Sequence, residues 1–289
     1  MPLPTSMPKV GIIITVYNGE PYIGPCIKAA LDQTYQSFEV IVIDDGSSDG
    51  TERICRSIKD SRFRYLNKGQ VGRQKALNEG VKSTDAEFIA INDADDLSLP
   101  CRLEYTLGFL LAHPNAAYVG TGFSKTTEFT GTIPPAVLKK WLPEAAPSVT
   151  WPSRSAVYRR NLFNHSTIMY PKRTWERIGG YDESLTLSED YDFYLRAMQC
   201  GPVALLPGRT VHWYTNPNGV FKQRAAQDNL ETLRVIKRRA HELLGLPGWL
   251  RLYQPLWEMG FQLTTQFPAL LGMIKSLQRV ATQHTKYLS

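Results

Sequence analysis

The sequence predicts an α/β fold in which a mostly parallel sheet is flanked by helices. Four short segments rich in β-branched and aromatic residues lie in the first hundred residues, at 9–16, 38–44, 62–67 and 87–93. Segments with helical character separate them, at 20–33, 50–59 and 72–81. This alternation of strand and helix periods predicts βαβ units and a parallel sheet buried on both faces.

The individual segments support these assignments. The strand segments read KVGIIITV, FEVIVID, RFRYLN and EFIAIND, which are typical strand compositions. The stretch DGSSDGTE offers Asp and Ser as cap residues before the second helix. The segment 126–160 is Pro-rich and too long for a plain connection, so we expect it to be functional or disordered.

Composition and charge narrow the class of protein. The 289 residues are 43% hydrophobic, without an apolar run of membrane-spanning length, and the N-terminus lacks the apolar middle of a secretory signal. We therefore expect a cytoplasmic protein. The four cysteines are scattered and favour neither disulfides nor a zinc site.

The net charge of +6 lies entirely in the last part of the chain. Residues 222–289 carry 10 Lys and Arg against 4 Asp and Glu, whereas residues 1–221 carry 23 of each. A basic helix with an apolar stripe, formed by Leu230, Leu233, Ile236 and Ala240, is predicted near the start of this part. Its alternative roles are peripheral contact with the anionic inner face of a membrane, packing on the catalytic domain, or a dimer contact.

Polar and acidic stretches follow the predicted strands. TVYNG follows the first, DDGSSDG the second and DADD the fourth, and the carboxyl ends of parallel strands meet at one edge of a sheet. Converging carboxylates need cations or hydrogen-bond donors. A divalent metal with a polyhydroxylated, phosphorylated ligand supplies both, and Asp95 is the candidate metal ligand. The absence of GxGxxG and GxxxxGK[ST] argues against a dinucleotide fold and a phosphate loop.

The motifs VGIIITVYNGEPYI, FEVIVIDDGSSDGT, NDADD and GGYDESLTLSEDYDFYLRA resemble, in order, those of family-2 glycosyltransferases. These are inverting enzymes with a GT-A fold that use nucleotide sugars. The resemblance spans roughly residues 8–200. It implies a catalytic domain at 1–221, with a nucleotide-binding half at about 1–122 and an acceptor-side half at about 123–221. A basic helical extension at 222–289 would follow.

The resemblance also implies roles for individual residues. Tyr17 would stack on a pyrimidine, Asp45 would accept the base N–H, Asp93 would accept ribose hydroxyls, and Asp95 would bind Mn²⁺ or Mg²⁺ bridging the diphosphate. The nucleotide-binding residues it implies are Thr15, Val16, Tyr17, Asp45, Arg73, Asp93 and Ala94. For Asp44, Asp49 and Asp96, helix capping and turn formation are the alternative roles.

A general base is expected at the start of the helix in LSEDYDFYLRA. Asp190 matches the second residue of the family's Glu-Asp motif, the usual base, with Glu189 as its supporting neighbour. Asp192 lies four residues before Arg196, and that spacing predicts an ion pair within the helix.

Three residues are weaker candidates. His212 is either a further metal ligand, as in some relatives, or a structural residue. His165 lies either at the acceptor side or in the core as a hydrogen-bonded histidine. Trp151, like Trp141, either stacks on an acceptor sugar or is buried beneath the long connection. Tyr214 is followed by Thr215 where the family often has Arg, which alters the expected contact to the diphosphate.

The function predicted is transfer of a sugar from a nucleotide sugar, a UDP-sugar above others, to a hydroxyl of a glycan or lipid-linked acceptor in surface polysaccharide synthesis. Inversion by single displacement needs one base and a divalent metal. The alternatives are a nucleotidyltransferase and a non-catalytic nucleotide-sugar binding module. No nucleic-acid partner is expected.

Overall fold

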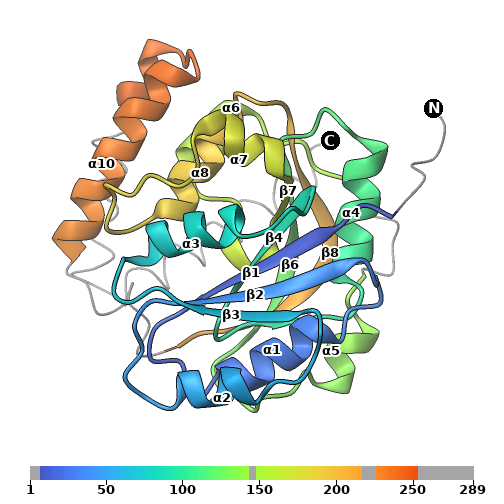
Figure 1. Cartoon of the computed structure of the whole chain (residues 1–289). Coiled ribbons are helices and arrows are strands. Elements are labelled where there is room, and N and C mark those ends of the chain that lie inside the picture. The colour runs from blue at the N-terminus through green and yellow to red at the C-terminus, as the bar shows by residue number, and fades with distance from the viewer. Residues whose placement is uncertain (1–6, 143–147, 217–225, 253–289) are drawn as a thin grey trace.

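The computed structural model describes residues 7–142, 148–216 and 226–252. Within these residues eight strands form one sheet, in the order β3-β2-β1-β4-β7-β6-β8-β5 (Figure 1). The strands are β1 (Val10–Val16), β2 (Phe38–Asp44), β3 (Phe63–Asn67), β4 (Phe88–Asp93), β5 (Leu97–Ser98), β6 (Tyr118–Thr126), β7 (Met169–Pro171) and β8 (Val203–Tyr214). The four predicted strands are confirmed, each starting at most one residue late.

The sheet is mostly parallel, as predicted. Strands β3, β2, β1 and β4 pair in parallel, and β6 pairs in parallel with β8. Strand β7 runs antiparallel between β4 and β6, and β5 runs antiparallel to β8. The register places Val16 beside Asp44 and Thr15 beside Asp93. The ends of β1, β2 and β4 are therefore level at one edge.

Helices cover both faces of the sheet. One face carries α1 (Ile23–Leu31), α2 (Thr51–Ser57) and α4 (Arg102–Ala112), which pack over Ile12, Ile14 and Val42. The other face carries α3, α6, α7, α8 and α10, packed over Ile13, Ile41 and Ile91 (Figure 1). The bounds of the remaining helices are α3 (Arg73–Lys82), α5 (Pro135–Lys139), α6 (Arg154–Arg159), α7 (Lys172–Ile178), α8 (Glu189–Ala197) and α10 (Ala226–Leu243), with 3₁₀ turns η1 (His165–Thr167) and η2 (Gly248–Leu252).

Local signals explain where several helices begin and end. The N-cap of α2 is Gly50, whose side chain offers no acceptor, rather than the Asp or Ser that the sequence predicted. Asp49, one residue earlier, accepts hydrogen bonds from the Thr51 backbone N–H at 3.0 Å and from the Thr51 hydroxyl. Helix α7 ends at Gly179, which has φ 76°, a left-handed conformation that favours glycine. The turn continues through Gly180, where a Cβ would lie 2.6 Å from Asn78 Oδ1. This turn brings Tyr181 back to the core.

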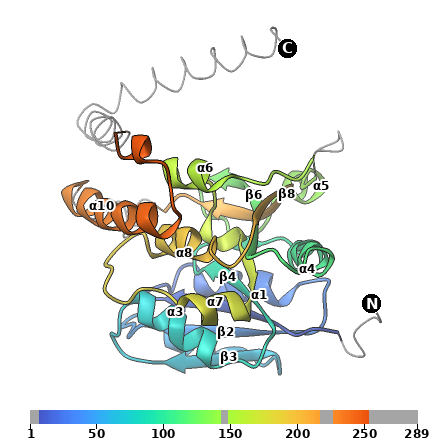
Figure 2. The same cartoon turned by 90° about the horizontal axis from the view of Figure 1, so that it is seen from above.

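Helix α10, in the described part of residues 222–289, packs on α8 and α6. Leu230, Leu233, Ile236 and Ala240 of α10 are at most 9% exposed, and α10 lies beside α8 and α6 (Figure 2). Lys237 is 4% exposed, with its ammonium 5.4 Å from the centre of the Tyr158 ring. Because an interfacial helix needs a free apolar face, packing is the alternative that the structure supports for α10. Residues 253–289 lie outside the described residues, and among those described no helix is long and apolar enough to cross a membrane.

Candidate active site

The ends of β1, β2 and β4 form the floor of the site. Thr15, Asp45 and Asp93 meet there because the strand register is level and because the Asp45 N–H donates to the Val16 carbonyl at 2.8 Å. The sequence prediction that these residues share one edge is confirmed. Tyr17 follows β1 and is 53% exposed, so its ring is accessible to a planar ligand.

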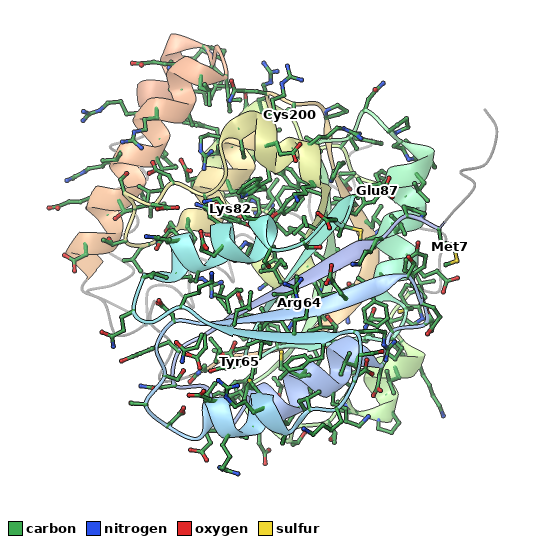
Figure 3. All side chains as sticks on the ribbon, viewed as in Figure 1. Met7, Arg64, Tyr65, Lys82, Glu87 and Cys200 are labelled. Carbon is green, nitrogen blue, oxygen red and sulfur yellow. The ribbon has the colours of Figure 1, made fainter. Side chains whose placement is uncertain are left out.

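The two aspartates after β2 have different surroundings. Asp44 is fully buried: its Oδ1 accepts from the Ser47 N–H at 2.8 Å and its Oδ2 from the Tyr65 hydroxyl at 2.7 Å. Tyr65 projects from β3 on the face covered by α1 and α2 (Figure 3). Asp44 therefore supports the turn.

Asp45 keeps one carboxylate oxygen available. Its Oδ1 accepts from the N–H groups of Val71 at 2.7 Å and Gly72 at 2.9 Å. Among the residues that the structure describes, none donates to its Oδ2. Asp45 therefore ties the start of α3 to the end of β2 and presents a single free acceptor to a ligand.

Arg73, the first residue of α3, connects the two halves of the site. Its Nε donates to Glu189 Oε1 at 2.6 Å, one terminal nitrogen donates to Thr15 Oγ1 at 2.9 Å, and the other to Asp93 Oδ1 at 2.5 Å. The side chain is 36% exposed. Burial opposes the charged form, but Asp93 and Glu189 outweigh it and raise the pKa of Arg73 well above its usual value. The guanidinium is a permanent cation between two carboxylates.

His165 lies beneath Arg73 and is neutral. Its Nδ1 is 3.2 Å from a terminal nitrogen of Arg73, and its Nε2 is 3.0 Å from the Tyr181 hydroxyl. Because a guanidinium only donates, Nδ1 accepts and the proton is on Nε2, which donates to Tyr181. Burial lowers the pKa of His165 to about 4, with Arg73 adding to the effect against the attraction of Asp93. Of the two alternatives for His165, the structure shows the buried, hydrogen-bonded one.

The loop from Asp93 to Asp96 is closed by residues distant in sequence. The Ser166 hydroxyl accepts from the Asp93 N–H at 3.0 Å and donates to Asp96 Oδ2 at 2.5 Å. The N–H of Tyr214 donates to Asp96 Oδ1 at 3.1 Å. Asp96 is fully buried, and burial with Asp93 and Asp95 nearby raises its pKa well above the usual value. Asp96 is structural, whereas Asp93 and Asp95 lie on the open side of the loop.

Arg102 lies under this loop with no exposed surface. It donates to Asn92 Oδ1 at 3.0 Å, to Ser98 Oγ at 2.8 Å and to the carbonyls of Ile91 and Ile168. Burial lowers the pKa of Arg102 to about 10, and the charge of the nearby Asp96 acts in the opposite direction, favouring the protonated guanidinium. The buried cation offsets part of the repulsion among the loop carboxylates.

Asp95 has the features of a partial metal site. Asn216 Nδ2 donates to its Oδ2 at 3.1 Å, and burial together with Asp93 raises its pKa. Asp93 and Asp95 are neighbouring carboxylates, and a hard divalent cation would offset the repulsion between them. The described residues contain no group of three or more His, Cys, Asp and Glu side chains placed to hold a metal. Phosphate and water oxygens would have to complete the coordination.

His212 does not join Asp95 in such a group. It pairs with Leu97 across β5 and β8, and its Nδ1 is 2.9 Å from the Ser124 hydroxyl. The antiparallel register brings Tyr214 and Asn216 to the acidic loop instead. The predicted role of His212 as a ligand receives no support from this placement.

Glu189 and Asp190 begin α8 on the far side of Arg73. The side chain of Glu189 is 11% exposed and is held by Arg73. Asp190 Oδ2 accepts from Asn161 Nδ2 at 3.1 Å. Burial, followed by the charge of Glu189, raises the pKa of Asp190 to about 7. Asp192 forms the predicted ion pair with Arg196, at 2.6 Å.

Trp151 is not brought to this cluster. Its ring centre is 5.5 Å from Phe109 and 5.5 Å from His113, which lie at the end of α4, and it is 45% exposed. Trp141 packs edge-on against Tyr105 at 5.1 Å. Helix α4 runs from the acidic loop back towards the opposite edge of the sheet, so Trp151 lies away from Asp95 and Asp190.

Three structural contributors were missed by the sequence analysis: Arg102, Asn161 and Ser166. Each contacts at least one residue distant in the sequence: Arg102 contacts Asn92 across 10 residues, Asn161 contacts Asp190 across 29, and Ser166 contacts Asp96 across 70. The available signals were a single Arg at the start of an apolar helix and the repeated Asn in NLFNHS. Neither indicates its partner.

Comparison with known sequences agrees with this geometry. The sequence profile described as Glycosyl transferase family 2 matches residues 11–177. EpsE of Bacillus subtilis is 29% identical over 258 residues, covering 87% of this chain and 89% of the relative. Chondroitin synthase of Escherichia coli is 29% identical over 200 residues, covering 68% of this chain and 27% of the relative. Relatives from Rickettsia felis and Rickettsia conorii are 29% identical, and the chain spans about a third of their length.

Solved structures share the fold. S. aureus TarS in complex with UDP-GlcNAc has a TM-score of 0.64 at 20% identity, covering 79% of this chain and 65% of that chain. The mannosyltransferase PcManGT from Pyrobaculum calidifontis, in complex with GDP-Man and Mn²⁺, has a TM-score of 0.62 at 20% identity, covering 96% and 82%. The mixed sheet with flanking helices is of the GT-A type that these structures represent, which confirms the predicted fold class.

Proposed function

We propose that this chain, which belongs to glycosyl transferase family 2, moves a sugar from a UDP-sugar to a hydroxyl of a glycan or lipid-linked acceptor with inversion. Surface polysaccharide synthesis is the process proposed for it. The observation that carries the proposal is the network around Arg73, which joins Asp93 on the nucleotide side to Glu189 beside Asp190. A nucleotide site and a carboxylate base are thereby adjacent.

The surroundings of Asp45 favour uracil over guanine. Uracil presents one N–H between two carbonyls, whereas the edge of guanine presents two adjacent N–H donors that suit both oxygens of a carboxylate. Asp45 Oδ1 already accepts two backbone N–H groups, so one oxygen is left for the base. TarS binds UDP and UDP-GlcNAc in its complexes, and PcManGT binds GDP-Man. Uridine is therefore the nucleoside that we propose.

Asp93 and Asp95 would serve the rest of the nucleotide. Asp93 is held by Arg73, whose charge and hydrogen bond keep the pKa of Asp93 below its usual value despite burial. As an acceptor it suits ribose hydroxyls. Asp95 would hold Mn²⁺ or Mg²⁺, with Asn216 orienting its carboxylate. When bound, such a cation neutralises charge on a departing diphosphate.

Asp190 is the proposed base. Inversion by single displacement forms the bond from the acceptor oxygen to the anomeric carbon as the bond from that carbon to the diphosphate oxygen breaks. Asp190 takes the proton of the acceptor hydroxyl in this step. A carboxyl group with a pKa of about 7 matches the basicity that efficient proton transfer requires near neutral pH. Glu189, fixed by Arg73, contributes by raising that basicity.

The proposal is tested by transfer from a panel of UDP-sugars, comparing the wild type with Asp190→Asn. The variant is expected to keep UDP affinity within about twofold and to lose transfer by a factor of about 10² or more, because the base acts in the transition state. Asp192→Asn in the same helix is the matched control. It breaks the ion pair with Arg196, so it should lower the melting temperature while keeping turnover.

Near-normal turnover of Asp190→Asn would contradict the assignment of the base. A wild-type protein that binds UDP-sugars without turnover would indicate a non-catalytic binding module. Release of pyrophosphate from a nucleoside triphosphate and a sugar phosphate would indicate a nucleotidyltransferase.

A further inference from the structure

We propose that Asn161 is a positioning residue for Asp190, holding carboxylate oxygen Oδ2 so that Oδ1 faces the acceptor hydroxyl. The inference rests on the proposed role of Asp190 as the base. Asn161 lies just after the long connection, between α6 and η1, and no pattern in the sequence indicates a role for it beside the base.

The orientation of the Asn161 amide is fixed by its two contacts. The N–H of Phe163 is 3.1 Å from Oδ1 of Asn161 and can only donate, so the amide oxygen faces it. The amide nitrogen then faces Asp190 and donates to Oδ2 at 3.1 Å. A flipped amide would place two donors together at Phe163 and two acceptors together at Asp190.

The segments that carry Asn161 and Asp190 are both held by residues of the same hydrophobic core. Phe163 is 6% exposed and packs on Tyr118 at 4.9 Å and Tyr194 at 5.5 Å between ring centres. The Tyr191 hydroxyl donates to the carbonyls of Val157 at 3.0 Å and Tyr158 at 2.6 Å, which ties α8 to α6. The contact between Asn161 and Asp190 is thus set by packed neighbours on each side.

The hydrogen bond from Asn161 acts on the pKa of Asp190 in the opposite direction to burial and the neighbouring carboxylates. Burial and the neighbouring carboxylates Glu189 and Asp93 raise the pKa of Asp190, whereas Asn161 and the Tyr191 backbone N–H lower it. Burial and the charge of Asp190 raise the pKa of the nearby Tyr194, and Arg73 on α3 pairs with Glu189. A donor that favours the ionised form holds the pKa of the base below the value that burial and the neighbouring charges alone would give it. Loss of that donor should leave more of the enzyme with a protonated base.

Two substitutions separate positioning from loop folding. Asn161→Asp keeps an oxygen for the Phe163 N–H but replaces the donor with a negative charge, whereas Asn161→Ala removes both contacts. Asn164→Asp is the matched control, because Asn164 caps the Ser166 N–H in the same loop through its Oδ1 and has no hydrogen bond to Asp190. It makes the same change in charge three residues away.

The readouts are the titration of Asp190, followed by ¹³C NMR of labelled aspartate without substrate, and the pH profile of kcat/KM for transfer from a UDP-sugar. The Asp190 signal is assigned by its loss in Asp190→Asn. We expect the pKa of Asp190 to rise by about half a unit to one unit in Asn161→Ala and by more in Asn161→Asp. The acid limb of kcat/KM should move by the same amount, with Asn164→Asp close to the wild type.

Two results would overturn the inference. An Asp190 titration unchanged in both Asn161 variants would exclude the positioning contact, whatever the enzyme transfers. An Asn161→Asp variant with a wild-type pH profile, beside an impaired Asn161→Ala, would show that only the turn at Phe163 matters. Failure of the proposed function is recognised separately, by normal turnover of Asp190→Asn or by no transfer in the wild type.

Discussion

The turn after β2 and the loop after β4 both combine one buried aspartate with aspartates available to a ligand, but they are closed in different ways. Asp44 is held by Ser47 and Tyr65, 3 and 21 residues away. Asp96 is held by Ser166 and Tyr214, 70 and 118 residues away. The first turn depends on residues close to it in the sequence, whereas the second needs Ser166 and Tyr214 in place. Perturbing Ser166 or Tyr214 should therefore disturb the loop after β4 and spare the turn after β2.

Arg102→Leu should give the largest effect. It removes the four buried hydrogen bonds that Arg102 donates, together with the buried cation near Asp96, and losing several hydrogen bonds from a buried charged donor costs about 3–5 kcal/mol. The melting temperature should fall by roughly 10 °C. Arg56→Leu, at an exposed pair with Glu52 on α2, is the control and should leave stability nearly unchanged, because solvent screens the pair. If Arg102→Leu lowered the melting temperature no more than Arg56→Leu, the buried cation would not be important for stability.

Asp45→Asn and Asp95→Asn should change UDP binding in different ways, which calorimetry with and without Mn²⁺ can distinguish. Asp45→Asn should weaken UDP binding by about 10-fold to 100-fold with and without Mn²⁺, because it loses a charged acceptor for the base. Asp95→Asn should leave metal-free binding unchanged and abolish the enhancement by Mn²⁺. If Asp95→Asn still shows the full enhancement, the metal is held elsewhere.

Ser166→Ala tests the dependence of the loop on distant residues. It removes both hydrogen bonds of the hydroxyl and should destabilise the fold by about 1–3 kcal/mol, because Asp96 stays buried with one donor fewer. It should also reduce the Mn²⁺ enhancement of UDP binding. Ser47→Ala, which removes an exposed hydrogen bond to the Asn18 N–H, is the control in the first turn and should cost less than about 1 kcal/mol. A larger loss of stability in Ser47→Ala than in Ser166→Ala would contradict the expected difference between the two loops.

His165 should give the smallest effect, visible as a pH dependence. Its pKa is about 4 in the fold against about 6.5 in the unfolded chain, so between these values the unfolded state binds the extra proton. Stability therefore falls as pH drops below 6.5, and His165 accounts for about 1.4 kcal/mol between pH 8 and pH 5.5. In urea denaturation, the free energy of unfolding of His165→Gln should fall less between pH 8 and pH 5.5 than that of the wild type, by this amount. An unchanged slope would mean that His165 is protonated in the native state.

The sequence alone determined the strands, most helices and the edge at which the acidic motifs meet. Its periodicities are local, and the direction of a parallel sheet places all strand ends together without any knowledge of side-chain contacts. It also determined the ion pair of Asp192 and Arg196, since four residues is one helical turn.

Only the tertiary structure decided which polar groups touch. Arg73 reaches Glu189 across 116 residues, and Asn161 reaches Asp190 across 29, because α3, α6 and α8 pack on one face of the sheet. The apolar stripe of α10 was evident in the sequence, but its covering by α6 and α8 was not, since amphipathic periodicity gives a buried face without its partner. Trp151 lies by α4 for the same reason: its neighbours follow from the path of the connection. Local pattern sets the elements, and long-range packing sets the contacts that make them a site.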